Sequence, residues 1–253
     1  MADTPARVGG RLTGTVTLVT GGAQGIGRGV AAAFRDAGST VVVADLDEAR
    51  AADLPGVDRV RMDVRDPASV ASATEQVVAR HGGLDTLVAS AGVYPNTPVL
   101  EMDPAEWDEV FAVNTRGVML AARAFAGAPG ASGAERRIIA ISSGAGRSAR
   151  VGAAHYCASK AALDMLVKVL ALELAPTTVN AVAPGLIEVP ATAALAPDYV
   201  ATLVAGQPVH RMGTPAEVAR ACLFLADPDS SFITGSVLDV DGGFLAGTPL
   251  PPS

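Results

Sequence analysis

The sequence predicts an α/β fold with a doubly wound parallel sheet and helices on both faces. Seven short runs rich in β-branched residues recur along the chain, at 15–20, 40–45, 58–64, 84–92, 136–143, 178–184 and 235–243. Longer segments with helical spacing of apolar residues separate most of them, and this alternation is typical of βαβ units. The runs are apolar along their whole length, as expected of strands covered on both sides.

Two segments between these runs are predicted to be long helices. Residues 104–126 begin with Pro104 after Asp103, a pairing that suits a helix N-terminus. In residues 161–175, leucines recur every three or four positions, and this stripe could be buried in the core or in a subunit interface. The stripe consists of Leu163, Leu166, Leu170 and Leu174.

The chain of 253 residues contains no polar linker, which predicts one domain over 11–246. Residues 1–10 are expected to be a flexible tail, and 247–253 a C-terminal tail that is disordered or reaches a neighbouring subunit. Residues 186–212 contain three prolines and depart from the strand–helix rhythm. Because long connections are usually functional or mobile, we expect a lid over a site there.

The composition limits the partners and the location. A net charge of −7 argues against nucleic acid or an anionic membrane as the main partner. There is no apolar leader in residues 1–10 and no apolar stretch long enough to span a membrane, so a soluble, cytoplasmic protein is expected. Cys157 and Cys222 form no ligand pattern with the three histidines, so we expect free thiols and no metal site.

A glycine-rich turn follows the first predicted strand. "TGGAQGIG", 20–27, leads into a helical segment, and glycines let the backbone approach a pyrophosphate at a helix N-terminus. Asp45 ends the second strand, near the offset at which an acidic side chain binds the ribose hydroxyls of NAD. An ordinary loop and a solvated strand end are the alternatives for each feature alone. Together they predict a Rossmann-like dinucleotide site that prefers NAD, because a carboxylate repels the 2′-phosphate of NADP and Gln24 adds no positive charge.

Tyr156 and Lys160 are four residues apart in "YCASK", within a chain that has three tyrosines and two lysines. Such a pair arises by chance in about one chain of this composition in forty. On a helix the two side chains share a face, so the ammonium is expected to favour the ionised phenol by Coulomb attraction. Tyr156 could then act as an acid and base near neutral pH.

With "TGGAQGIG", "VNTRG", "ISSGAG" and "YCASK" in this order, the chain resembles the short-chain dehydrogenase/reductase family over residues 11–245. The resemblance implies that Tyr156 is the general acid and base and that Lys160 assists it and binds the nicotinamide ribose. It also implies that Ser143, rather than Ser142, orients the substrate oxygen, and that Asn114 supports a proton relay to the lysine. Singly, Ser143 could cap a turn and Asn114 could be an ordinary polar residue in a helix.

The resemblance implies further contacts with the cofactor along the whole chain. The residues concerned are Gly21, Gln24, Gly25, Ile26, Gly27, Asp45, Leu46, Asp63, Val64, Ala89, Gly92, Tyr156, Lys160, Pro184, Gly185 and Ile187. The sequence departs from the family pattern in two places. "ASAG" at 89–92 replaces "NNAG", and Val189 stands where a threonine is usual, so local rigidity and lid closure are expected to be weaker.

The resulting functional hypothesis is an NAD-dependent oxidoreductase that acts on a secondary alcohol or ketone. A 3-oxoacyl-thioester reductase, acting on acyl carrier protein or CoA substrates, is the first alternative, and a non-catalytic NAD-binding regulatory protein is the second. The apolar lid favours a neutral small-molecule substrate, whereas Arg147 and Arg150 could meet an anion or simply be exposed. The resemblance also implies a homo-oligomer, most commonly a tetramer.

Overall fold

A computed structural model describes residues 10–247, so the predictions for residues 1–9 and 248–253 lie outside the described residues. Within this range the seven strands form one parallel sheet in the order β3-β2-β1-β4-β5-β6-β7. The strands are β1 Val16–Thr20, β2 Thr40–Asp45, β3 Asp58–Arg61, β4 Thr86–Ala89, β5 Arg137–Ile141, β6 Thr178–Pro184 and β7 Val237–Val240. The predicted doubly wound α/β fold is confirmed.

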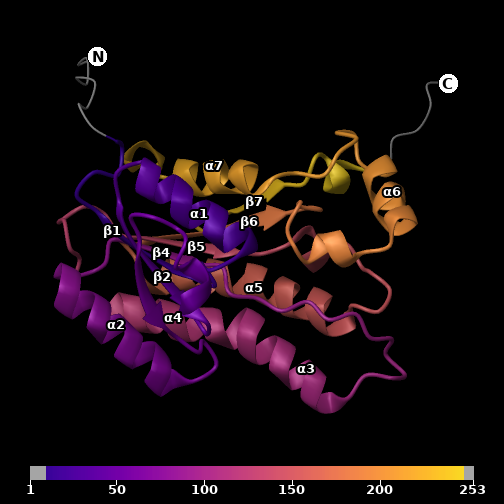
Figure 1. Cartoon of the computed structure of the whole chain (residues 1–253), viewed down its shortest axis with the longest axis horizontal. Coiled ribbons are helices and arrows are strands. Elements are labelled where there is room, and N and C mark those ends of the chain that lie inside the picture. The colour runs from indigo at the N-terminus through magenta and orange to yellow at the C-terminus, as the bar shows by residue number, and fades with distance from the viewer. Residues whose placement is uncertain (1–9, 248–253) are drawn as a thin grey trace.

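Helices cover both faces of the sheet (Figure 1). The helices of residues 10–247 are α1 Gly25–Asp36, α2 Pro67–His81, α3 Pro104–Phe111, α4 Gly117–Gly127, α5 Ala154–Glu173, α6 Pro197–Ala205 and α7 Pro215–Ala226, of which α6 lies away from the sheet. One apolar layer, around Phe34, lies between the sheet and the pair α1 and α7. The other, around Phe125, lies between the sheet and helices α2, α4 and α5. No helix of residues 10–247 is both long and apolar enough to cross a membrane.

Local sequence signals account for several helix starts. Asp66 and Asp103 accept hydrogen bonds from the backbone two residues ahead, and each is followed by a proline at the first helical position. Thr214 and Glu217 form a capping box at the start of α7. These caps satisfy backbone N–H groups that a helix leaves unpaired, which fixes where each helix begins.

The predicted helix over 104–126 is not continuous. A turn of π-helix at Ala112–Arg116 separates α3 from α4, and Asn114 lies in it. Such turns occur mostly where a side chain must be placed for function. The predicted helix at 161–175 begins earlier, at Ala154, so that α5 also contains Tyr156 and Lys160.

The leucine stripe of α5 is only partly a core feature. Leu163 and Leu170 are buried, whereas Leu166 and Leu174 are partly buried at the edge of the core. On another face of α5, Met165, Val169 and Leu172 are exposed, with Leu172 82% accessible. The helix therefore has an apolar face that the described chain does not cover.

Residues 186–212 form a loop whose two ends meet. The Glu188 N–H donates to the Gly213 carbonyl and the Gly213 N–H donates to the Leu186 carbonyl, at 2.8 and 2.9 Å. The segment contains the nine-residue helix α6. We call residues 186–212 the lid segment.

Candidate active site

A cavity of about 850 Å³ opens at the carboxyl ends of the central strands, beneath the lid segment. This is where the strand order reverses between β1 and β4, the usual place for a ligand in a doubly wound sheet. Most of the residues predicted to contact a cofactor line it: Gly21, Gln24, Gly25, Ile26, Gly27, Asp45, Leu46, Asp63, Val64, Gly92, Tyr156, Lys160, Pro184, Gly185 and Ile187. Ala89 does not, because it is buried at the end of β4 and the wall there is Ser90, Ala91 and Gly92.

The glycine-rich turn has the geometry of an anion cradle. Gly21 and Gly25 have positive φ angles of 64° and 53°, where other residues are strained. A Cβ atom at Gly21 would lie 2.6 Å from the Ala91 Cα, and one at Gly27 would lie 2.2 Å from the Gly21 carbonyl oxygen. The first turn of α1 contains no acidic side chain, and Gln24 makes no side-chain cap there. The backbone N–H groups at the start of α1 can therefore bind a pyrophosphate, so the residues of this turn fit a dinucleotide.

Asp45, the acidic residue expected to bind a ribose, lies at the end of β2 beside the glycine-rich turn. The Asp45 carboxylate accepts hydrogen bonds from the Ala23 and Asp47 N–H groups, each at 3.1 Å. These bonds fix the carboxylate at the cavity wall. Arg50, which the sequence analysis did not consider, also lines this end; it donates to the Gln24 side chain at 3.2 Å and pairs with Asp47.

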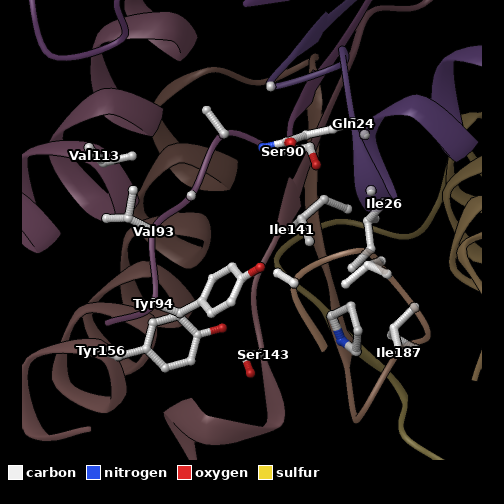
Figure 2. A pocket seen from close by; sticks show the side chains of 18 of the residues that line it. Gln24, Ile26, Ser90, Val93, Tyr94, Val113, Ile141, Ser143, Tyr156 and Ile187 are labelled. Atoms are coloured by element: carbon white, nitrogen blue, oxygen red, sulfur yellow. The ribbon is translucent and has the colours of Figure 1, made fainter. Parts of the chain in front are cut away.

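Tyr156 lies at the other end of the cavity, on the first turn of α5. Figure 2 shows the Tyr156 and Tyr94 rings on one wall, with Ile26 and Ile187 across the cavity. The two rings make an edge-to-face contact with centroids 6.1 Å apart. Burial raises the pKa of the Tyr156 phenol above its ordinary value, while the neighbouring Ser143 hydroxyl and the Arg150 charge oppose that rise.

The predicted lowering of the Tyr156 pKa by Lys160 is therefore wrong for this structure, because desolvation of a buried phenol outweighs the charges around it. Lys160 is itself buried, its Nζ 5.8 Å from the centre of the Tyr156 ring. The ammonium donates to the Ile141 carbonyl at 2.8 Å, and burial lowers the pKa of Lys160 to about 8.

The two candidate serines, Ser142 and Ser143, make contacts with different residues. Ser142 donates to the Asp164 carboxylate, away from the phenol. Ser143 follows β5 and lines the cavity beside the Tyr156 phenol, whose pKa it lowers. It also accepts from the Ala145 N–H at 3.2 Å, so it caps a turn at the same time. The geometry therefore favours Ser143 as the residue beside a substrate oxygen.

Asn114 lies behind the cavity wall rather than in it. Its side-chain oxygen accepts from the Val93 N–H, and its amide donates to the Val93 carbonyl and to Ser159, at 2.9 to 3.1 Å. A Cβ atom at Gly92 would lie 3.4 Å from this Asn114 oxygen and 3.9 Å from the Lys160 Nζ. Asn114 thus supports the backbone against which Lys160 is placed.

At both departures from the family pattern, the "ASAG" segment and Val189, a nearby threonine hydroxyl bonds the backbone. The Thr20 hydroxyl accepts from the Ser90 and Ala91 N–H groups at 3.2 and 3.3 Å, which anchors the "ASAG" segment. In the lid segment the hydroxyl of Thr192 bonds the backbone on both sides of Val189, at 2.8 to 3.0 Å. The hydroxyls of Thr20 and Thr192 therefore fix the backbone at the two positions where the sequence departs from the family pattern.

Comparison with known proteins decides the family. A protein-family model described as enoyl-(acyl carrier protein) reductase matches residues 21–245. The chain belongs to the short-chain dehydrogenase/reductase family. It is an oxidoreductase of a family that acts on CH–OH groups and binds a nicotinamide cofactor.

Individual relatives of this dehydrogenase/reductase cover nearly its full length. It is 38% identical to cis-4-hydroxycyclohexanecarboxylate dehydrogenase of Sinomonas cyclohexanicum, over 91% of the chain and 96% of that protein. It is 36% identical to a 3-oxoacyl-(acyl-carrier-protein) reductase of Thermotoga maritima, over 93% of the chain and 99% of that protein. A solved 7α-hydroxysteroid dehydrogenase, complexed with NADH and a 7-oxo bile acid, superimposes with a TM-score of 0.86 at 28% identity, over 92% and 95% of the two chains.

Proposed function

We propose that this enzyme transfers a hydride between NAD(H) and a secondary alcohol or ketone of a small molecule. The observation that supports this most is that Ser143, Tyr156 and buried Lys160 line one cavity, which also contains Asp45 at its far end. The cofactor-binding residues would be the glycine turn at the pyrophosphate and Asp45 at the adenosine ribose. Lys160 would bind the nicotinamide ribose.

Each catalytic side chain has one task. A bound nicotinamide ring would accept or supply the hydride at the carbinol carbon. In oxidation, the Tyr156 phenolate accepts the alcohol proton, and in reduction the phenol returns a proton to the forming alkoxide. The Ser143 hydroxyl stabilises the same oxygen, and the Lys160 ammonium favours the phenolate once it forms. Asn114 holds the backbone at Val93, and thereby the wall between Lys160 and the cavity.

The preference for NAD rests on Asp45. Its carboxylate can accept hydrogen bonds from ribose hydroxyls and repels a 2′-phosphate. Arg50 supports the alternative, NADP(H), because its guanidinium lies at the same end of the cavity. Since Arg50 is paired with Asp47, its charge is partly neutralised, and NAD remains the better match.

The alcohol of the Sinomonas relative is carried by a six-membered ring, which suits the mostly apolar substrate end of this cavity. A 3-oxoacyl thioester is the second candidate substrate, supported by the 36% identity to the Thermotoga reductase.

The test is a panel of substrates with NAD and with NADP, followed by the absorbance of the reduced cofactor. The panel contains cyclohexanol, cis-4-hydroxycyclohexanecarboxylate, and a 3-hydroxyacyl-CoA. We expect turnover of ring alcohols with NAD, and a loss of about 100-fold or more in Tyr156→Phe, since acid–base catalysis typically contributes that much. Turnover of the thioester alone, or equal activity in Tyr156→Phe, would contradict the proposal.

We also propose that the enzyme is a homotetramer, in which the exposed apolar face of α5 contributes to a subunit interface. Sedimentation that gives a monomer at micromolar concentration would refute this.

A further inference from the structure

One arginine at the substrate end of the cavity has no part in the proposed proton transfer. Arg150 lies on the loop between β5 and α5 and lines the cavity together with Tyr199 of the lid segment. Its guanidinium donates to the Tyr199 hydroxyl at 3.0 Å. Within residues 10–247, Arg150 makes no ion pair with a carboxylate, so its charge is balanced only by a neutral partner and by solvent.

A second arginine of this loop, Arg147, differs from Arg150 because it has carboxylate partners. Arg147, three residues earlier, pairs with Asp239 and lies 3.5 Å from Asp164. It is therefore held on the sheet side of the loop by two carboxylates. Sequence alone did not separate the two arginines, but in the structure only Arg150 of the two lines the cavity, and it has no carboxylate partner among residues 10–247.

The surroundings of Arg150 make this charge selective. The substrate end of the cavity is otherwise formed by uncharged residues such as Tyr94, Pro95, Ala153 and Leu195. The acidic residues that line the cavity, Asp45, Asp47, Asp63 and Glu109, belong to the cofactor end. An anion entering the substrate end would thus meet the exposed Arg150, whereas Lys160 is buried and already donates to the Ile141 carbonyl.

Arg150 is also close to the reacting group. Its positive charge is one of the influences that lower the pKa of the Tyr156 phenol, against the larger effect of burial. The Ala153 N–H donates to the Arg150 carbonyl at 3.2 Å just before α5 begins, so Arg150 and Tyr156 line the same cavity from one short stretch of the chain.

We propose that Arg150, with the Tyr199 hydroxyl, binds the carboxylate of a compact hydroxy acid or keto acid whose reacting carbon lies at Tyr156 and Ser143. This proposal rests on the proposed function and names the class of substrate that this site takes. Arginine suits the role because its planar fork of N–H donors matches a carboxylate, and a phenolic hydroxyl can add a third bond. The reaction at the alcohol carbon is unchanged, since the carboxylate only orients the molecule.

A phosphate of CoA or of an acyl carrier protein is the other anion that an arginine could bind. In those substrates a long pantetheine arm separates the phosphate from the thioester. Arg150 lines the same cavity as Tyr156 and Ser143 and lies only six residues before Tyr156 in the chain, so the carboxylate of a compact substrate is the better match. We therefore commit to the carboxylate.

The experiment compares the ring hydroxy acid of the panel with its primary carboxamide, which keeps the shape and removes the charge. In the wild type with saturating NAD, kcat/KM for the acid should exceed that for the amide. In Arg150→Gln, kcat/KM for the acid should fall about 10- to 100-fold, the usual range for a hydrogen bond to a charged group, while the amide changes less than about threefold. Arg147→Gln is the matched control, and it should leave the ratio of acid to amide unchanged.

Tyr199→Phe tests the competing explanation that Arg150 only fastens the lid segment. It removes the bond between Arg150 and Tyr199 but keeps the charge, so the acid should remain preferred. Equal losses for acid and amide in Arg150→Gln, reproduced by Tyr199→Phe, would overturn the proposal in favour of the lid contact. An effect of Arg150→Gln on the CoA thioester, with none on the acid, would overturn it in favour of a phosphate site.

A binding measurement separates this proposal from the proposed function. Calorimetry with cyclohexanecarboxylate and with cyclohexanecarboxamide, on protein saturated with NAD, needs no turnover. We expect the carboxylate to bind more tightly, and to lose about tenfold or more in Arg150→Gln. Turnover of cyclohexanol without this preference would refute the carboxylate site alone, whereas the preference without turnover would refute the proposed reaction alone.

Discussion

Replacement of Lys160 by methionine should stabilise the protein while abolishing its activity. The ammonium is buried, and burial lowers the pKa of Lys160 from 10.5 to about 8. At about 1.4 kcal/mol per pH unit, this means that the folded state disfavours the charged form by about 3 kcal/mol. Methionine has a similar length and no charge, but it loses the hydrogen bond to the Ile141 carbonyl, which costs about 1 kcal/mol.

The net expectation at pH 7 is that Lys160→Met raises the free energy of unfolding by about 2 kcal/mol. The difference should depend on pH with a definite sign. Between about pH 8 and 10.5 the unfolded wild type still binds a proton at Lys160 and the folded wild type does not, so wild-type stability rises with pH relative to the variant. The difference in free energy of unfolding between the variant and the wild type should therefore decrease between about pH 8 and 10.5.

Guanidinium unfolding at one protein concentration, followed by circular dichroism at pH 7 and at pH 10.5, measures both effects. Lys168→Met is the matched control, because Lys168 is the other lysine of the chain and is exposed on the same helix. That change should alter stability by less than about 0.5 kcal/mol. A variant at Lys160 that is less stable than the wild type at pH 7, or a difference that does not shrink with pH, would refute the reasoning.

Two further predictions concern the cofactor and the acid–base pair. Asp45→Ser should lower kcat/KM with NAD about 10- to 100-fold and raise it with NADP, because the ribose loses charge-assisted hydrogen bonds and the 2′-phosphate loses a repulsive neighbour; an unchanged ratio of the two cofactors would contradict the assignment. Because burial raises the pKa of Tyr156, alcohol oxidation should increase by about tenfold per pH unit between pH 7 and 9, whereas ketone reduction should be nearly constant there; initial rates in both directions over this range test it.

The parts of the fold that the sequence predicted best are those set by local pattern. Strands covered on both faces consist of continuous apolar runs, and β2 and β6 have the predicted boundaries. The start of α3 at Pro104, after the capping residue Asp103, is also where the sequence predicted it. The π-turn at Ala112–Arg116 could not be predicted in this way, because it depends on Asn114 meeting Val93 and Ser159 from distant segments.

In the candidate site, too, the features set by local sequence were predicted and those that depend on distant residues were not. Motif spacing brought Ser143, Tyr156 and Lys160 together correctly in space. It gave the wrong direction for the Tyr156 pKa, because that depends on how deeply the ring is buried and on the side chains packed around it, including Tyr94. It also missed Arg50 beside Gln24 and the bond between Arg150 and Tyr199, since each joins residues many positions apart.

Two cations act near Tyr156 by different physical means. Lys160 is buried, so its charge is costly to the fold but acts in a medium of low dielectric, where it favours a negative charge that develops on the phenol. Arg150 is exposed, so it costs the fold little and its charge is screened by solvent until a ligand covers it. If a substrate carboxylate neutralises Arg150, one influence that lowers the Tyr156 pKa is lost, and Ser143 is the influence in that direction that remains. The buried cation therefore serves the proton transfer and the exposed one serves substrate selection, which is why a change at Lys160 should stop every substrate while a change at Arg150 should affect only the acids.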